Sequence, residues 1–166
     1  IAYIIPLNLD ISQYHIYYYG KIKQKELNIL DPSDIIQLVV LIVLIMMSAF
    51  FSSAETSFVT VNQIKMRSLA EDGNKKAKRV LKITSDSSKM LSAILIGNNL
   101  VNIAASSLAT TLTLQLWGNA FVSVTTGVLT LIVLIFGEIT PKTFATAYAD
   151  KIAPIYSGPI IFLMTI

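Results

Sequence analysis

The stretch LIVLIFGEITPK, Leu131–Lys142, places a carboxylate directly behind a long apolar run that begins near Ala120. A charged side chain inside a bilayer costs roughly 2.5–3.5 kcal/mol on insertion scales, so an acid there marks an ion or substrate pathway by default. Pro141 has no N–H to donate, and its ring clashes with the carbonyl of Gly137, four residues earlier. We therefore expect the helix to end at Pro141, with a free backbone oxygen beside the Glu138 carboxylate.

The composition of the whole chain is that of a membrane protein. Hydrophobic residues make up 54% and charged residues 14% of the 166 residues, and the mean hydropathy is +0.64. Soluble domains carry about 25% charged residues. Cysteine is absent, which excludes disulfides and thiolate metal sites. The composition predicts an all-α integral membrane protein.

Three apolar segments are long enough to cross a bilayer, which takes about 20 helical residues. They lie at about 35–56, 90–117 and 120–141. The first contains the run IIQLVVLIVLIMMSAFFSSA, with one amide and no charge, and Ser33 or Asp34 is expected to cap it. Small residues in the middle of the second segment permit close contact between helices in lipid. The sequence therefore predicts three membrane spans.

The connection between the first two spans is strongly basic. Residues 61–89 hold eight basic residues against three acidic ones, which leaves a net charge of +5. The positive-inside rule places such a loop in the cytoplasm, which puts the N-terminus outside and Lys142 back at the cytoplasmic face. Nucleic-acid binding is not expected, because no aromatic residues are interleaved with the charges. The pattern predicts either two short helices on the inner membrane surface, broken at Gly73-Asn74, or a solvated helical hairpin.

The two ends of the chain are less informative. Residues 1–30 hold five of the seven tyrosines and His15, and they are either an interfacial aromatic belt or a non-native or disordered segment. Residues 143–166 contain Pro154 and Pro159, which disfavour a straight fourth span, so we expect a juxtamembrane or re-entrant helix there. Because the chain starts with Ile and stops within an apolar run, we expect a membrane domain over 31–166 that is truncated at its C-terminus.

Polar side chains recur at helical spacing inside the spans. Ser48 and Ser52 lie four residues apart and project from one face of the first span; Asn98, Asn102 and Ser106 form a similar row in the second. The third span adds its acid and the adjacent carbonyl. Any single hydroxyl or amide is explained as well by a hydrogen bond between helices, worth about 0.6 kcal/mol. That interpretation accounts for neither the carboxylate nor the proline, so the group as a whole predicts a cation site.

All the ligands available in the spans are oxygens. The absence of His and Cys from these segments disfavours Zn²⁺ or Cu⁺ and favours Mg²⁺, Ca²⁺, Mn²⁺ or Na⁺. Two hydroxyls, an amide, a carbonyl and a carboxylate suit Mg²⁺, which demands near-octahedral geometry. An enzyme is not expected, because no nucleophile–base pair or second acid lies near Glu138. Glu55, at the inner end of the first span, is expected to pair with a lysine.

Three motifs, SAFFSSAETSF (Ser48–Phe58), IGNNLVNIA (Ile96–Ala104) and FGEITPK (Phe136–Lys142), resemble the transmembrane domain of the CorC/cyclin M (CNNM) family of Mg²⁺ transporters. Members are also called haemolysin-like proteins. The resemblance runs from about Asp34 to the end of the chain. It implies three spans with juxtamembrane helices at 60–89 and 143–166, a homodimer, and a cytosolic pair of CBS domains that binds ATP in full-length members.

The resemblance also implies Mg²⁺ export coupled to Na⁺ entry, in a multi-pass protein of the plasma membrane. Matched by motif, Ser48 and Ser52 correspond to hydroxyl ligands, Asn98 to the amide ligand, and Gly137 and Glu138 to the carbonyl and carboxylate ligands. The supporting or hinge residues expected around the site are Asn102, Pro141, Glu55 and Lys142. A different function remains open: a membrane-anchored regulator whose spans dimerise the CBS domains and whose bound Mg²⁺ is sensed.

Overall fold

The structure, a computed structural model, describes residues 31–165. The aromatic belt or non-native segment expected at residues 1–30, including His15, lies outside the described residues. The chain divides into two units, residues 1–36 and residues 37–166, and the packing discussed below is that within the second unit. The described part of the chain contains helices and no strand, which confirms the all-α fold class.

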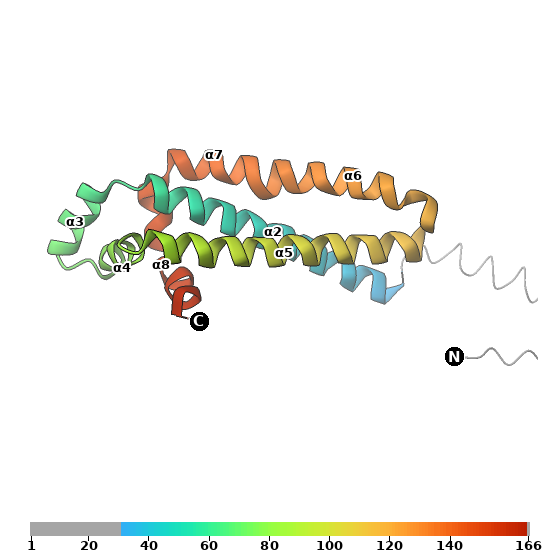
Figure 1. Cartoon of the computed structure of the whole chain (residues 1–166), viewed down its shortest axis with the longest axis horizontal. Coiled ribbons are helices and arrows are strands. Elements are labelled where there is room, and N and C mark those ends of the chain that lie inside the picture. Colours follow the sequence, from blue (N-terminus) through green and yellow to red (C-terminus); the bar gives the residue numbers. More distant parts are fainter. Residues whose placement is uncertain (1–30, 166) are drawn as a thin grey trace, which may run out of the picture. The chain divides into compact units, whose positions relative to one another are not determined.

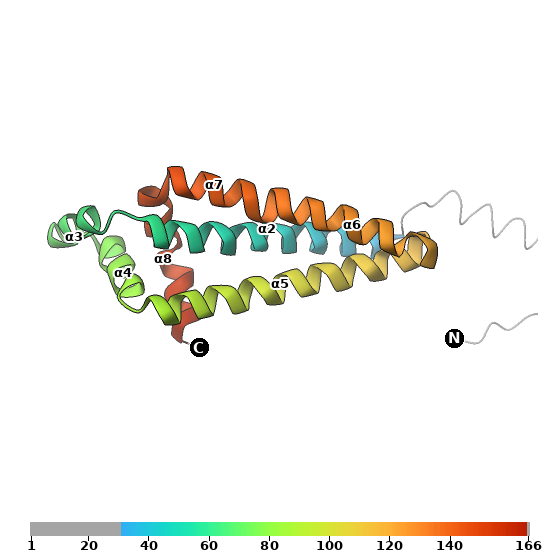
Figure 2. The ribbon, with the colours of Figure 1, turned by 45° about the horizontal axis from the view of Figure 1, so that its top comes forward.

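Three helical segments of residues 31–165 are long and apolar enough to cross a membrane, as the sequence predicts. From Gln37 onward they run alongside one another in both views of the ribbon (Figures 1 and 2). The third segment is made of several helical pieces in direct succession. The bounds are α2 Pro32–Thr60, α5 Ser87–Leu116, η1 Asn119–Phe121, α6 Val122–Ile132, the π-helical η2 Val133–Ile139, and α7 Thr140–Ala147.

The third segment does not end at Pro141, as the sequence led us to expect, but continues to Ala147. The physical reason is the π-helical turn directly before the proline. In this turn the N–H of Thr140 bonds to the carbonyl of Ile135, five residues back instead of four. The wider turn accommodates Pro141, the second residue of α7, without ending the helix.

Two short helices connect the first two long ones: α3 Gln63–Glu71 and α4 Lys75–Thr84. Each begins at an asparagine whose side chain accepts hydrogen bonds from backbone N–H groups of the first turn. Asn62 accepts from Lys65, and Asn74 accepts from Lys76 and Ala77. Between them Gly73 has a φ of 88°, a left-handed conformation that glycine adopts without strain. The break expected at Gly73-Asn74 is therefore a helix cap.

The last helix, α8 Ala149–Thr165, packs against α4 and α5 and contains Pro154 and Pro159 in its interior. The region expected to form a juxtamembrane or re-entrant helix is thus one helix that packs against α4 of the basic segment. Its first turn is tied to α3 by Asp150, whose carboxylate accepts the backbone N–H of Asn62 at 2.9 Å and bonds Lys65 Nζ at 3.0 Å. The Asn62 N–H, followed by the Lys65 ammonium, lowers the pKa of Asp150 below its usual 3.8.

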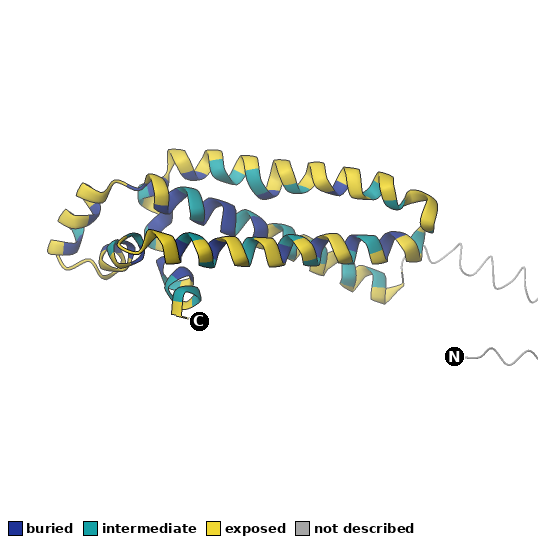
Figure 3. Ribbon diagram, viewed as in Figure 1, coloured by how far each residue is buried: buried dark blue, intermediate teal, exposed yellow. Residues whose placement is uncertain are grey.

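The buried core lies where α3, α4 and α8 meet the C-terminal end of α2 and the N-terminal half of α5, coloured dark blue toward the left of Figure 3. Along the three long helices most apolar side chains are instead exposed; Ile96, Leu100 and Ile103 on α5 are 68–69% exposed. A soluble monomer rarely exposes contiguous apolar surface on this scale. Hydrocarbon covers such surface at no cost, so the distribution of burial agrees with helices that face lipid.

Candidate cation site

Two of the predicted ligands touch each other between the first two long helices. The hydroxyl of Ser48 on α2 donates to Oδ1 of Asn98 on α5 at 3.3 Å, and Ser48 is only 1% exposed. Adjacent oxygens around a Mg²⁺ ion with ligands at 2.0–2.1 Å are about 2.9 Å apart. A small approach of the two helices would therefore bring both oxygens to ligand positions on one ion.

The third long helix reaches the same point through Gly137, which is buried. A Cβ atom built on Gly137 would lie 3.0 Å from Oγ and 3.4 Å from Cβ of Ser48. The backbone of η2 is therefore in direct contact with the serine, and a glycine is needed for this approach. The structure thus brings Ser48, Asn98 and Gly137 together from three separate helices.

One backbone carbonyl beside this contact has no backbone donor. The carbonyl that would accept an N–H from residue 141 is that of Gly137 in an α-helix and that of Phe136 in a π-helix. Pro141 has no N–H, so this carbonyl lacks its donor. In either case one carbonyl oxygen of η2 is left available to a ligand. The sequence assigns this oxygen to Gly137, whereas the π-helical turn makes Phe136 an equal candidate.

Two further polar atoms near the contact are buried without a hydrogen-bond partner among the described residues: Oγ of Ser52 and Oδ1 of Asn102. Each lies one helical turn from a residue of the contact, Ser52 from Ser48 and Asn102 from Asn98. Leaving a buried polar atom unpaired costs about 1–3 kcal/mol, which a bound cation would offset. The row does not extend further, since Ser106 is exposed.

Glu138 follows Gly137 on η2 and is partly exposed. With the described residues its carboxylate forms neither a salt bridge nor a hydrogen bond, so the structure does not place it in contact with Ser48 or Asn98. Within residues 31–165 no three His, Cys, Asp or Glu side chains come together. A cation held here would therefore be bound mainly by neutral oxygens, with a single carboxylate to balance its charge.

An ion pair joins the first and third long helices beside the proline. Nζ of Lys142 on α7 lies 3.3 Å from a carboxylate oxygen of Glu55 on α2, and the two side chains are 44% and 29% exposed. Glu55 was expected to pair with a lysine, and Lys142 is that lysine. A pair this exposed stabilises the fold by less than about 1 kcal/mol, so its contribution lies in orienting α7 against α2.

The partners in two further contacts were not predicted from the sequence, although the small residues of the second span, Gly97 among them, were expected to allow close contact between helices. Gly97 lies against the ring of Phe51, where a built Cβ would come within 2.6 Å of two ring atoms. Near the other end of α2 and α5, Gln37 Nε2 donates to Gln115 Oε1 at 3.3 Å, and Oε1 of Gln37 is buried with no partner in the part of the chain that the structure describes. Gln37 is the single amide in the first apolar run, and this isolation could have indicated a polar contact with another helix. Nothing in the neighbouring sequence identifies Gln115 as its partner.

Three bilayer-length helices with inward-facing oxygen atoms between them define an integral membrane protein of helical type with a polar site among its spans. Residues 39–166 match the family model described as the cyclin M transmembrane N-terminal domain. The chain belongs to this family, the CorC/cyclin M (CNNM) family, as its three motifs indicate.

Curated relatives agree with this assignment. The UPF0053 inner membrane protein YfjD of Escherichia coli is 48% identical over 106 residues, which cover 64% of this chain and 25% of that protein. A UPF0053 protein of Haemophilus influenzae is 44% identical over 115 residues, 69% of this chain and 27% of that protein. A chloroplastic DUF21 domain-containing protein of Arabidopsis thaliana is 43% identical over 128 residues, 76% and 19% of the two chains. The chain spans about a quarter of the length of the two bacterial relatives.

Proposed function

We propose that this chain is the membrane-spanning part of a Mg²⁺ transporter that exports Mg²⁺ in exchange for Na⁺. The observation that carries the proposal is the convergence of α2, α5 and η2 at Ser48, with the unpaired oxygens of Ser52 and Asn102 one turn away. Such a set of oxygens, without nitrogen or sulfur, suits a hard cation. Membership of the CNNM family supports Mg²⁺ as the transported ion.

The cation would be stabilised in three ways. The hydrogen bond between Ser48 and Asn98 would break, and both side chains would rotate so that their oxygens face the ion. The free carbonyl of η2 would add a ligand whose dipole is already oriented by the helix. Glu138 would balance part of the charge, which is needed because a divalent ion without a counter-charge is strongly disfavoured between membrane helices.

Alternating access would use the π-helical turn beside the site. The π-helical turn and Pro141 interrupt regular pairing in the third segment, and broken helices are the elements that move in many transporters. Movement of η2 away from Ser48 would remove the backbone contact and open the site. The ion pair between Glu55 and Lys142 is exposed enough to break and re-form during such a cycle.

The topology and the partners are part of the same proposal. Residues 61–89 would face the cytoplasm and the N-terminus the outside of the plasma membrane, because of the net positive charge of that segment. The transporter would be a homodimer whose cytosolic CBS domains bind ATP, and it would have no enzymatic activity of its own. These properties follow from the resemblance to the CNNM family and the motifs quoted above.

The test is Mg²⁺ flux in liposomes that contain the purified protein, with and without a Na⁺ gradient. Glu138→Ala and Asn98→Ala should abolish the flux, while Asn99→Ala is a matched control, since Asn99 is the adjacent amide and is exposed. Gel filtration would check that each variant keeps its fold and its oligomeric state. Normal flux in both site variants would refute the site assignment. Absence of flux in the wild type, with Mg²⁺ binding that Glu138→Ala removes, would instead favour the membrane-anchored regulator.

A further inference from the structure

The short helix α4 exposes a stripe of positive charge that its packing holds in one orientation. Its apolar residues Ala77, Val80 and Ile83 are at most 1% exposed and face the core that α4 forms with α8. The opposite side is basic, and Lys75, Lys78 and Lys82 lie within about 60° of one another around the helix axis. The exposed basic residues of α4 are Lys75, Lys76, Lys78, Arg79 and Lys82.

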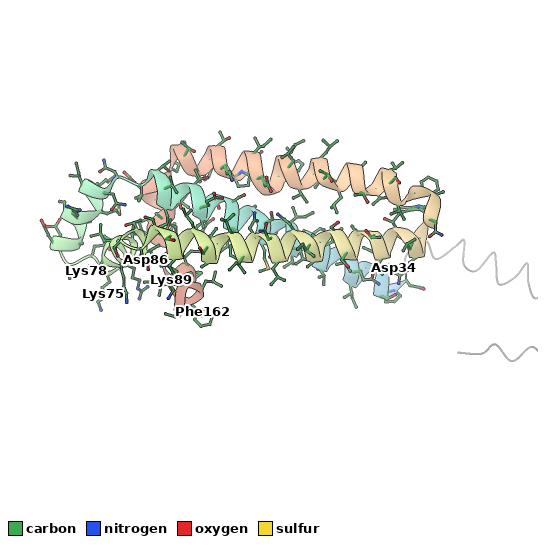
Figure 4. All side chains as sticks on the ribbon, in the orientation of Figure 1. Asp34, Lys75, Lys78, Asp86, Lys89 and Phe162 are labelled. Carbon is green, nitrogen blue, oxygen red and sulfur yellow. The ribbon has the colours of Figure 1, made fainter. Side chains whose placement is uncertain are left out.

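An apolar stripe on α8 lies next to Arg79, at the edge of this charge. Ile155 and Phe162 are 62% and 66% exposed, and they share a helix face with Gly158 because the three are spaced at i, i+3 and i+7. Arg79 Nη1 lies 4.0 Å from the position of a Cβ built on Gly158, so the guanidinium of α4 reaches this face of α8. Figure 4 shows Lys75, Lys78 and Lys89 at the same end of the helix bundle as Phe162, and α4 packs against α8.

The combined surface lies next to a membrane span. α4 ends at Thr84, and α5, the second span, begins at Ser87 and packs against both α4 and α8. Over residues 75–89 there are six basic residues and one acid, Asp86, which is used as the N-cap of α5. Exposed apolar side chains beside cations are the pattern of helices that lie in the bilayer interface.

We propose that α4 and the exposed stripe of α8 bind the phosphate headgroups of anionic phospholipids in the adjacent leaflet. The cations contact the headgroups, and Ile155 and Phe162 enter the boundary with the acyl chains. Each basic residue near an anionic leaflet strengthens such binding by about fivefold. The site is separate from the cation site between the spans, and the proposal does not depend on Mg²⁺ transport.

The experiment compares the association of spin-labelled phosphatidylglycerol and phosphatidylcholine with the reconstituted protein, measured by the motionally restricted fraction in electron paramagnetic resonance. The wild type should prefer phosphatidylglycerol by at least about fivefold, the contribution of one such cation, and Lys75→Gln/Lys78→Gln/Lys82→Gln should lower the preference severalfold. The preference should also fall as ionic strength rises from about 0.1 M to 1 M, which shortens the screening length from about 10 Å to about 3 Å.

Matched variants separate this site from a general effect of charge. The single change Lys78→Gln should weaken the preference, whereas Arg67→Gln, which removes an equally exposed cation from α3, should leave it unchanged. Lys75→Arg/Lys78→Arg/Lys82→Arg should keep the preference and serves in place of the glutamine variant if that variant does not fold. Equal association of both lipids with the wild type would overturn the proposal and favour an acidic protein partner. Competition by inorganic phosphate at constant ionic strength would overturn it in favour of a soluble phosphate ligand.

Discussion

Replacing Gly137 with alanine is the most direct test of the contact between η2 and Ser48. The added Cβ would lie 3.0 Å from Ser48 Oγ, about 0.4 Å inside an ordinary contact of 3.4 Å. The serine must therefore move by a few tenths of an ångström. Metal–ligand distances tolerate changes of about 0.2 Å. We expect Gly137→Ala to weaken Mg²⁺ binding by about 10–100-fold, the range seen when groups that orient a ligand are altered.

The effect on stability should be small, because two contributions oppose each other. Overpacking costs about 1–3 kcal/mol. The change from glycine to alanine in a helix returns about 1 kcal/mol. The free energy of unfolding of Gly137→Ala should therefore fall by about 0–2 kcal/mol, far less than is needed to abolish binding through unfolding.

The assay is isothermal titration of Mg²⁺ into the purified protein, with thermal unfolding measured on the same preparations. Gly127→Ala is the matched control, since Gly127 lies on α6 of the same segment and a Cβ built there has no neighbour within 4 Å. The control should bind Mg²⁺ like the wild type. Unchanged Mg²⁺ affinity in Gly137→Ala would refute the assignment of the Ser48 contact as the cation site, whatever its effect on stability.

Three further predictions concern the contacts that hold the helices together. Gly97→Ala should lower the unfolding temperature, because the new Cβ would lie 2.6 Å from ring atoms of Phe51 and overpacking costs about 1–3 kcal/mol. Adding Phe51→Leu should restore the unfolding temperature. Equal unfolding temperatures for Gly97→Ala and the wild type would contradict the close approach of the two helices. The pKa of Asp150 is lowered in the folded state, so its contribution is complete above its usual value of 3.8 and is lost as the pH falls through the lower folded value. Asp150→Asn should therefore cost about 1–2 kcal/mol at pH 7 and remove part of the acid sensitivity seen in thermal unfolding between pH 5 and pH 2, whereas identical pH profiles would exclude this role. A double-mutant cycle with Glu55→Gln and Lys142→Met should give a coupling energy below about 1 kcal/mol, and a value above about 2 kcal/mol would mean that the pair is far better shielded from water than its exposure indicates.

The membrane spans could be derived from the sequence because the signals are local, whereas the cap expected at Ser33 or Asp34 was wrong, since α2 begins earlier, at Pro32. A run of about 20 apolar residues needs no partner to be identified as a span. An asparagine directly after a turn glycine caps the next helix through its own side chain, as Asn74 does after Gly73. The helix of the third segment continues past Pro141 to Ala147 for a reason that is not local. Pro141 is a local signal for a helix break, but the π-helical turn before it, in which Gly137 packs against Ser48 of another helix, has no such local signal.

The sequence by itself determined the class of the protein and the kind of atoms in its site: three apolar helices, one acid in the third, and rows of hydroxyl and amide groups at helical spacing. Only the tertiary structure decided which oxygens meet. Helical periodicity specifies the face on which a side chain lies, but the rotation and height of one helix against another follow from steric fit. Here the ring of Phe51 packs against Gly97, and the backbone of η2 packs against Ser48. Ser52 Oγ, one turn from Ser48, is buried without a partner among the described residues.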